Sequence, residues 1–352
     1  MKKLLLIPLM AVLVGSLIFG VASISFAGPK VWNLKLAHEG PVVGYFHKYG
    51  KVPWVKDVEK ATNGKVKITI YPSQTLCKAK DTLEAVRSGI TDIGRVYMGY
   101  FPGVFPLSEH IYLPFLGITS AETAGRTCWE VYEKFPEIQA EYKRQGVKPL
   151  AIPTTDINFI VTTKKPVRKL EDIKGLKLRV PSGPATDMMR HLGATPMLVP
   201  MPGCYINMQK GVMDGMGDLA YAVTTYKHYE LVNYMTMVPL FCGSFLFVIN
   251  DNVWNSMPPD VQNQVMSVSG RSLSERMGRE VFDRSAKEMS VKIKQAGYSP
   301  EYIYLPPEEQ LRWVEVAGKP VWDAWVAKIK AKGLPGREVL DETLRLAKKY
   351  SK

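Results

Sequence analysis

The chain has 352 residues and a formal net charge of +13; 46% of its residues are hydrophobic and 22% are charged. These proportions are ordinary for a globular protein. The lysines and arginines are scattered and form no basic run interleaved with aromatic residues, so nucleic acid is not an expected partner. An anionic small ligand, or simply a solvated basic surface, is favoured.

Residues 1–27 have the pattern of a cleaved export signal. Lys2 and Lys3 precede an apolar stretch, and Ser25-Phe26-Ala27 puts small residues at the two positions that a signal peptidase inspects. Cleavage there lowers the formal charge from +13 to +11 and leaves about 325 residues, which suits two domains. An uncleaved membrane anchor is the alternative, because the apolar run is nearly long enough to span a bilayer. We expect an exported, periplasmic protein.

The first half of the mature chain alternates strands with helices. Strand-like alternation of apolar residues gives way to helical spacing, and the helices end at glycines. This β-α-β-α-β order is typical of a parallel or mostly parallel sheet covered by helices. The expected elements are, in turn, residues 31–37, 46–62, 65–72, 79–89 and 91–100.

The second half repeats this logic with different residues. A strand, a Pro-Ser-Gly-Pro turn and a helix are followed by a second strand and a short helix, which occupy residues 176–180, 181–184, 185–192, 195–200 and 205–211. Two such β/α units, joined by an extended connection, imply two lobes with a cleft between them. Loops at the carboxyl ends of the strands are expected to line that cleft.

Arg179 lies where the strand of residues 176–180 meets the following turn and helix. Its planar guanidinium carries a fork of donors that can hold a carboxylate bidentately, which lysine cannot reproduce. The free N–H groups of a helix beginning near Pro184 would also attract an anion. The alternative is a structural salt bridge with a neighbouring acid. Its place beside a β-α turn, at a strand end expected to face the cleft, makes a role in ligand binding about as well supported as a salt bridge, and the residues alone leave both open.

Several fragments carry a family resemblance when they are taken together. In order and spacing, KVKITIYPSQTL, AKDTLEAVRSGITDIG, IYLPFLG, KKPVRKLEDIKGLKLRVPSG, LGATPM and YINMQKGVMDG resemble the solute-binding proteins of tripartite ATP-independent periplasmic (TRAP) transporters, the DctP family. The resemblance covers essentially the whole mature chain. It places Arg179 on the carboxylate-clamping arginine of the family.

The resemblance implies a two-lobed α/β periplasmic binding protein with mixed sheets flanked by helices, hinge strands and a shared long helix. We expect lobe I to comprise 28–155 plus 243–285, and lobe II to comprise 156–242 plus 286–352 with the C-terminal helices. Such a protein closes around a small organic acid and delivers it to small and large integral-membrane subunits driven by an ion gradient. No enzyme activity, cofactor or metal is expected, and the protein is expected to be a monomer.

Other residues that end strands are weaker candidates for contact with the ligand. They are Met216 and Asp218 after the VMDG motif, His38 and Glu39 after the first strand, and Tyr97 and Tyr100 after the third. A turn aspartate that caps its own loop is the commoner situation, and the tyrosines can equally fill the core. The histidines are scattered, so His38 has little support as a metal ligand or a base.

The hinge segment departs from the family pattern. Many members have a second arginine where this chain has Asn158, with Asp156 two residues earlier. Asn158 brings no charge, so the sequence predicts a monocarboxylate with a polar, amino or aromatic group in preference to a dicarboxylate. The alternative is that another basic residue, Arg95 or Lys35, replaces the missing arginine.

Two other classes of protein remain alternatives. An exported α/β hydrolase is disfavoured because no Gly-x-Ser-x-Gly, His-Glu-x-x-His or Gly-x-x-x-x-Gly-Lys motif is present. A sensory ligand-binding protein would have the same cleft. The four cysteines, Cys77, Cys128, Cys204 and Cys242, lack zinc-site spacing, and the sequence leaves open whether they are disulfide-bonded or free.

Overall fold

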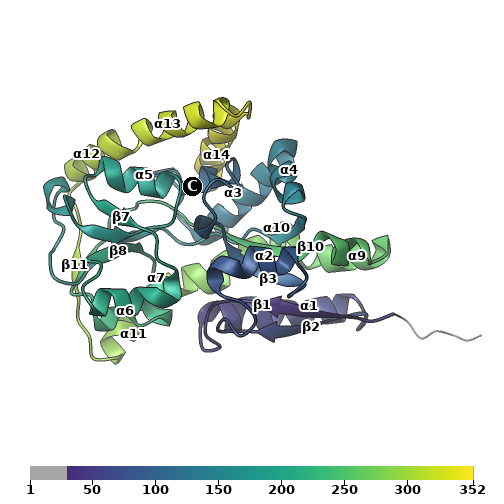
Figure 1. The fold of residues 1–352 in the computed structure, drawn as a ribbon. Helices are drawn as coiled ribbons and strands as arrows, with labels where there is room; N and C mark the ends of the chain where they lie inside the picture. Colours follow the sequence, from purple (N-terminus) through teal and green to yellow (C-terminus); the bar gives the residue numbers. More distant parts are fainter. Residues whose placement is uncertain (1–29, 352) are drawn as a thin grey trace, which may run out of the picture. The chain divides into compact units, whose positions relative to one another are not determined.

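The computed structural model describes residues 30–351, so the predicted export signal lies outside the described residues. The chain from Val31 onward forms one compact unit that contains two β-sheets flanked by helices (Figure 1). Within residues 30–351, no helix is both long enough and apolar enough to cross a membrane.

The first sheet has the strand order β2-β1-β3-β10-β4. The strands β1, β2 and β3 run parallel, whereas β10 is antiparallel to both of its neighbours, so the sheet is mixed as expected. Strand β10 comes from late in the chain and closes a sheet that is otherwise built from the first half. The strands are β1 Trp32–Ala37, β2 Val66–Tyr71, β3 Ile93–Tyr97, β4 Val147–Ala151 and β10 Phe245–Asn250.

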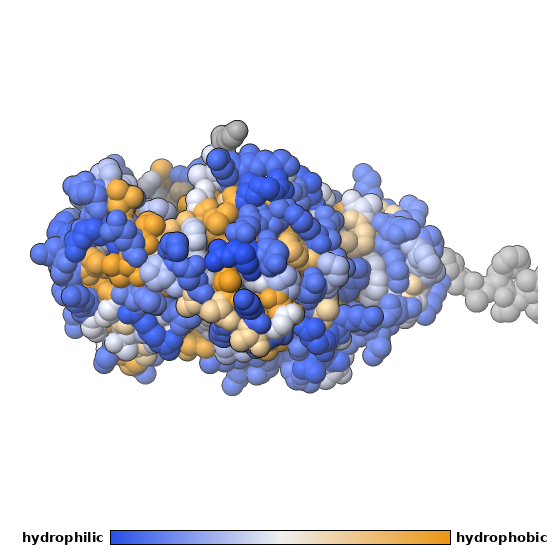
Figure 2. Space-filling view, turned by 90° about the horizontal axis from the view of Figure 1, so that it is seen from above, coloured by the Kyte–Doolittle hydropathy of each residue, from blue (hydrophilic) through white to orange (hydrophobic). Residues whose placement is uncertain are grey.

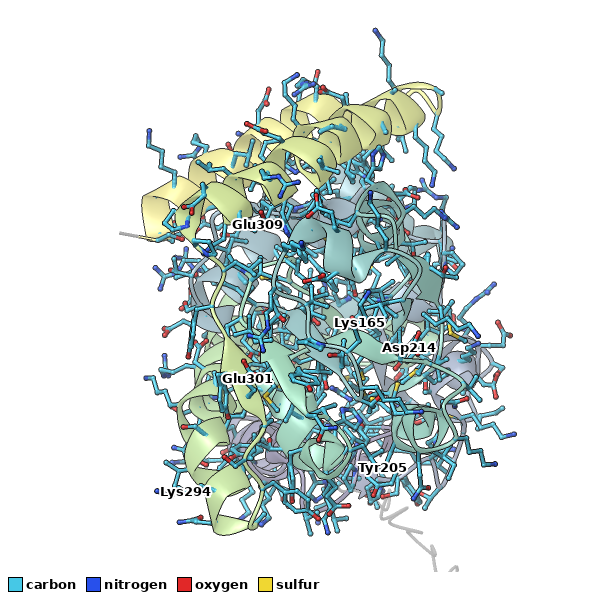
Figure 3. The ribbon with its side chains drawn as sticks, turned by 90° about the vertical axis from the view of Figure 1, so that its left-hand side faces the viewer. Lys165, Tyr205, Asp214, Lys294, Glu301 and Glu309 are labelled. Atoms are coloured by element: carbon cyan, nitrogen blue, oxygen red, sulfur yellow. The ribbon has the colours of Figure 1, made fainter. Side chains whose placement is uncertain are left out.

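The second sheet has the order β11-β9-β5-β8-β6-β7 and is also mixed. Strand β6 pairs in parallel with β7 and β8, and β5 is antiparallel to β8 and β9. The strands are β5 Phe159–Thr162, β6 Lys177–Arg179, β7 Thr195–Met197, β8 Gly215–Asp218, β9 Tyr234–Thr236 and β11 Glu301–Ile303. Figure 3 views this sheet from the left of Figure 1, with Asp214 and Glu301 on the side facing the viewer.

The helices cover both sheets and account for most of the remaining chain. Those before the second sheet are α1 Val52–Ala61, α2 Thr82–Arg87, α3 Ala121–Lys134 and α4 Pro136–Arg144. Those within it are α5 Pro184–His191, α6 Cys204–Gln209 and α7 Ala220–Thr225, and those after it are α8 Asp251–Asn255, α9 Pro259–Ser267, α10 Gly270–Met277, α11 Arg284–Gln295, α12 Pro307–Ala317, α13 Lys319–Lys330 and α14 Gly336–Tyr350. A π-helical turn, Phe46–Lys51, precedes α1.

A continuous helical segment connects the two sheets. Helix α10 packs on α3 and β4, helix α11 packs on α7, and a π-helical turn, Gly278–Asp283, joins α10 to α11. Gly278 permits close packing, because a Cβ there would lie 2.4 Å from the carbonyl oxygen of Ala121. The Asp283 carboxylate accepts hydrogen bonds from the N–H groups of Ala121 and Glu122 at 2.7 and 3.1 Å, and so satisfies the start of α3.

The C-terminal helices connect regions that the sequence assigns to different lobes. Helix α13 packs on α5, beside the second sheet, whereas α14 packs on α3, which belongs to the first. The predicted lobe boundaries therefore stay a prediction. Figure 2 looks down on these helices, and blue hydrophilic residues cover most of that face, in keeping with the exposed lysines Lys319, Lys328 and Lys330 of α13.

Candidate ligand-binding site

A cavity lies between the two sheets and is lined by side chains from both. Its volume is about 20 Å³. Five of its eleven lining residues are aromatic, and three carry a formal charge. The lining residues are Glu39, Arg95, Tyr97, Tyr100, Thr155, Arg179, Met201, Leu219, Tyr221, Tyr226 and Phe245.

Arg179 ends β6, lines the cavity and is only 1% exposed. Its Nε donates to the carbonyl of Val199 at 2.9 Å, and its guanidinium carbon lies 6.0 Å from the centre of the Tyr97 ring. Its Nη2 has no hydrogen-bond partner. The guanidinium therefore retains unused donor capacity in a buried position, where an unpaired donor is costly.

Helix α5 does begin at Pro184, but its start does not line the cavity. Gly183 has φ +75°, and a Cβ there would lie 3.0 Å from the carboxylate of Glu109. That carboxylate also accepts a hydrogen bond from the Gly103 N–H at 3.3 Å. The positive end of α5 thus faces an acid of the protein itself, and the contribution expected from this helix to anion binding is absent from the cavity.

Arg95 lies on β3, two residues before Tyr97, and alternation along the strand puts both side chains on one face. Its Nη1 donates to the carboxylate of Glu39 in a buried ion pair. Burial is the largest single influence and lowers the pKa of Arg95, but Glu39, Tyr221 and Tyr226 together raise it further, so the net shift is upward. The guanidinium carbon lies 4.0 Å from the Phe46 ring centre and 3.6 Å from that of Phe245.

Behind Arg95 lie basic groups that do not line the cavity. Burial, followed by the charge of Arg95, lowers the pKa of Lys51 well below its ordinary value, and its Nζ lies 4.1 Å from the Phe46 ring centre. Burial likewise lowers the pKa of His38, whose Nε2 is 3.1 Å from Nδ1 of His47. Within residues 30–351, no group of three or more His, Cys, Asp or Glu is arranged to hold a metal ion.

Loop segments of the two sheets contact each other around the cavity. The Met201 N–H donates to the Tyr100 hydroxyl at 2.8 Å, and the Ser182 N–H donates to the Gly99 carbonyl at 3.0 Å. Gly99 fits only because it has no side chain: a Cβ there would lie 2.5 Å from Cβ of Pro181. These contacts, with the small free volume, describe a closed arrangement of the two sheets.

The side chains of the two candidates from the hinge segment, Asn158 and Asp156, form hydrogen bonds with backbone groups of the protein. Asn158 is 1% exposed, and its Nδ2 donates to the Phe241 carbonyl at 3.1 Å. Asp156 accepts a hydrogen bond from the Ala220 N–H at 3.4 Å through Oδ2, while its Oδ1 has no partner. Neither residue lines the cavity. The contact of Asn158 and Asp156 with a ligand stays a prediction.

Asp218 and Met216 on β8 are likewise held within the protein. Asp218 accepts from the Leu219 N–H at 2.9 Å, and its other oxygen is 2.7 Å from Nδ1 of His228. Met216 is fully buried in the smaller of the two hydrophobic clusters. Of the residues predicted from sequence, the structure brings together Glu39, Tyr97, Tyr100 and Arg179 along one cavity, and places His38, Asn158, Asp156, Asp218 and Met216 outside its lining.

Sequence reasoning missed most of the remaining lining. Arg95 appeared only as an alternative, although its i, i+2 spacing from Tyr97 was a usable signal. Phe245 lies directly opposite Tyr97 across the β3–β10 pair, which no local pattern reveals. Tyr221 and Tyr226 belong to the region of α7, whose placement depends on α11. All four cysteines, left open by the sequence, are free thiols.

Two mixed sheets around a closed cavity that has an unpartnered cationic donor define a solute-binding protein. The chain matches the family model of bacterial extracellular solute-binding protein, family 7 (DctP), over residues 41–329. It therefore belongs to this family of TRAP solute-binding proteins, which confirms both the resemblance and the two-lobed α/β fold class.

Three relatives illustrate the range within the family. A TRAP periplasmic solute-binding protein from Desulfovibrio salexigens is 34% identical, with 91% of this chain and 96% of that one covered and a TM-score of 0.77. A TRAP solute-binding protein from Rhodoferax ferrireducens, in complex with copurified benzoate, is 26% identical, with 91% and 98% covered and a TM-score of 0.84. The C4-dicarboxylate-binding periplasmic protein of Rhodobacter capsulatus is 25% identical over 276 residues, 78% of this chain and 80% of its own.

Proposed function

We propose that this protein captures a small organic acid with one carboxylate, that Arg179 holds this carboxylate, and that the acid is delivered to TRAP-type membrane subunits. The observation that carries the proposal is the unpartnered Nη2 of a buried arginine in a cavity between two sheets. A carboxylate supplies both the acceptors and the charge that Arg179 lacks.

The charges that line the cavity favour a monoanion. Arg95 and Arg179 bring two positive charges, and Glu39 brings one negative charge that is already engaged with Arg95. One carboxylate balances the remainder, whereas a second would be buried beside Glu39 without a counter-ion. The benzoate-bound and the C4-dicarboxylate-binding relatives are similarly distant from this chain, so sequence identity does not choose between their ligand classes. The charge of the cavity favours the class that contains benzoate.

The expected setting follows from the family. Relatives named as periplasmic binding proteins support an exported location. The signal is proposed to be cleaved near Ala27, and small and large TRAP membrane subunits are the proposed partners. No catalysis is proposed, because the carboxylate that lines the cavity, that of Glu39, is engaged in an ion pair with Arg95, and the lining includes no histidine or cysteine. A sensory protein would share this cavity and would differ only in its partner.

Native purification, without refolding, tests the proposal directly. Mass spectrometry of the small molecules released from the protein is expected to find a monocarboxylic acid. Calorimetry with wild type and Arg179→Lys is then expected to show tight binding of that acid to the wild type alone. A retained dicarboxylate, or equal affinity of the two proteins for the acid, would contradict the proposal.

A further inference from the structure

The end of the cavity formed by Glu39 and Arg95, here called the Arg95 end, has hydrogen-bonding groups left over after the two side chains have paired. Oε2 of Glu39 has no donor, and Nε and Nη2 of Arg95 have no acceptor. Glu39 is 6% exposed and Arg95 is 1% exposed, so water does not readily satisfy them. A buried acceptor and a buried donor on neighbouring side chains that both line the cavity form an incomplete site.

The kinds of group that a ligand can present to the Arg95 end are distinguishable by their charge and their hydrogen bonds. A second carboxylate could accept from Arg95 but would be buried against the Glu39 carboxylate. An ammonium group could donate to Glu39, but it has no acceptor for Arg95 and would lie against its positive charge. A hydroxyl group is neutral, donates one hydrogen bond and accepts others, so it alone matches Glu39 and Arg95 together.

The walls between the two ends indicate the body of the ligand. Tyr97 and Tyr100 pack edge to face with ring centres 4.9 Å apart, and the Tyr97 ring centre is 4.7 Å from that of Phe245. Two further lining residues, Tyr221 and Tyr226, pack edge to face at 6.4 Å. Aromatic surfaces of this kind favour a flat ring, which can pack edge to face or offset against them.

We infer that the ligand is a hydroxylated aromatic monocarboxylate, whose carboxylate meets Arg179 and whose hydroxyl donates to Oε2 of Glu39 and accepts from Arg95. This inference rests on the proposed function and deepens it by naming the chemistry at the second end of the same cavity. Glu39 is thereby a specificity-determining residue, because it leaves room for one anion in the cavity and offers the acceptor for a hydroxyl.

Exchanging Glu39 for glutamine reverses the preference at the Arg95 end. In Glu39→Gln the amide oxygen takes the place of Oε1 beside Arg95, and the amide nitrogen then presents donors where Oε2 presented an acceptor. Donors from this new amide and from Arg95 would then face the ligand, and the charge of Arg95 would no longer be balanced by a carboxylate. That arrangement suits a second carboxylate better than a hydroxyl.

The test is calorimetry with benzoate, 3-hydroxybenzoate, 4-hydroxybenzoate, 3-(aminomethyl)benzoate and isophthalate, acids that share a benzoate core and differ in one substituent. Wild type is expected to bind at least one hydroxybenzoate about tenfold or more tighter than benzoate, because sites built to hydrogen-bond a hydroxyl strongly reject the analogue that lacks it. It is expected to bind isophthalate and the aminomethyl acid more weakly than either hydroxybenzoate. In Glu39→Gln the hydroxybenzoate advantage should be lost and the affinity for isophthalate, relative to benzoate, should rise about tenfold.

The matched control is Glu84→Gln, the same chemical change at an exposed position on α2, which should leave every affinity unchanged. Equal binding of benzoate and both hydroxybenzoates to the wild type, or a wild-type preference for isophthalate, overturns the inference even if Glu39→Gln fails to fold. Equal binding of the three monocarboxylates would leave the capture of a monocarboxylate intact, whereas a preference for isophthalate would also contradict the single carboxylate of the proposed function. Absence of binding by all five acids would overturn the inference of an aromatic ligand, whereas the proposed function is tested separately by the mass spectrometry of the retained molecule.

Discussion

Arg95, in the middle of β3, and Arg179, at the end of β6, are chemically the same and equally buried, each 1% exposed beside the cavity. They differ in their partners. Arg95 has Glu39 as an internal counter-ion, whereas Arg179 donates to the Val199 carbonyl, lies against the Tyr97 ring and forms no ion pair among residues 30–351. The carboxylate of Asp218 also acts on the charge of Arg179, but both of its oxygens already have partners within the protein. The charge of Arg95 is already balanced within the protein, whereas the charge of Arg179 is left for a ligand to balance.

Arg95→Met is expected to have the largest effect on stability. Loss of the guanidinium leaves the Glu39 carboxylate buried without a counter-ion, which should lower the free energy of unfolding by about 3–5 kcal/mol. Denaturant unfolding at neutral pH measures this. The control is the double variant Glu39→Gln/Arg95→Met, which removes both charges and should recover most of the loss. Equal stability of the single and double variants would show that Glu39 does not depend on Arg95.

Arg179→Lys is expected to have the largest effect on binding. Lysine keeps the charge but cannot make the bidentate contact, so the affinity for the ligand should fall by about 2–5 kcal/mol while the free energy of unfolding changes little. Arg179→Met sharpens the comparison, because removing an unbalanced buried charge should leave the empty protein equally or more stable, the opposite of Arg95→Met. A stability loss in Arg179→Met as large as that in Arg95→Met would end the distinction between the two arginines.

Gly99→Ala tests whether the closed arrangement is needed to bring the two arginines to one ligand. A methyl group at this position would lie 2.5 Å from Pro181, across the contact between the two sheets, so closure should be hindered while each sheet stays folded. We expect an affinity loss of about 1–3 kcal/mol, the usual cost of overpacking. Small-angle scattering should show that saturating ligand shrinks the wild type more than the variant. Identical scattering and affinity would indicate that Gly99 has no part in closure.

The sequence could predict the architecture and one end of the site, because both rest on local patterns. Strand, turn and helix follow one another around Arg179, and Glu39, Tyr97 and Tyr100 come just after or at the ends of strands, where cleft residues are expected. Asn158 shows the limit of this reasoning. The partner of its amide is the Phe241 carbonyl, 83 residues away, on a strand connection that no local pattern positions. The pairing of Arg95 with Glu39 is likewise a tertiary contact. Because of it, Arg95, which the sequence offers as a replacement for the missing second arginine, has its charge balanced within the protein.

Asp156 provides the last and smallest prediction, because it is a buried charge that is poorly compensated but does not line the cavity. Burial, followed by the charge of Asp283, raises the pKa of Asp156 well above its ordinary value. The unfolded chain therefore ionises this carboxyl at lower pH than the folded protein does. Stability attributable to Asp156 is present at pH values below its ordinary pKa and is lost as the pH rises from there through the folded pKa.

Asp156→Asn removes this loss, so we expect the variant to be more stable than wild type at neutral pH by about 1 kcal/mol, the lower end of the usual cost of a buried polar group left without a hydrogen-bond partner. The difference should shrink toward pH ~4, where the ordinary pKa of an aspartate lies, and ligand affinity should not change at any pH. Thermal unfolding across this range, with calorimetry at its two ends, measures both quantities. Asp156→Asn could instead alter affinity as much as Arg179→Lys does. That result would show that Asp156 contacts the ligand although it lies outside the cavity lining, and the prediction would be wrong.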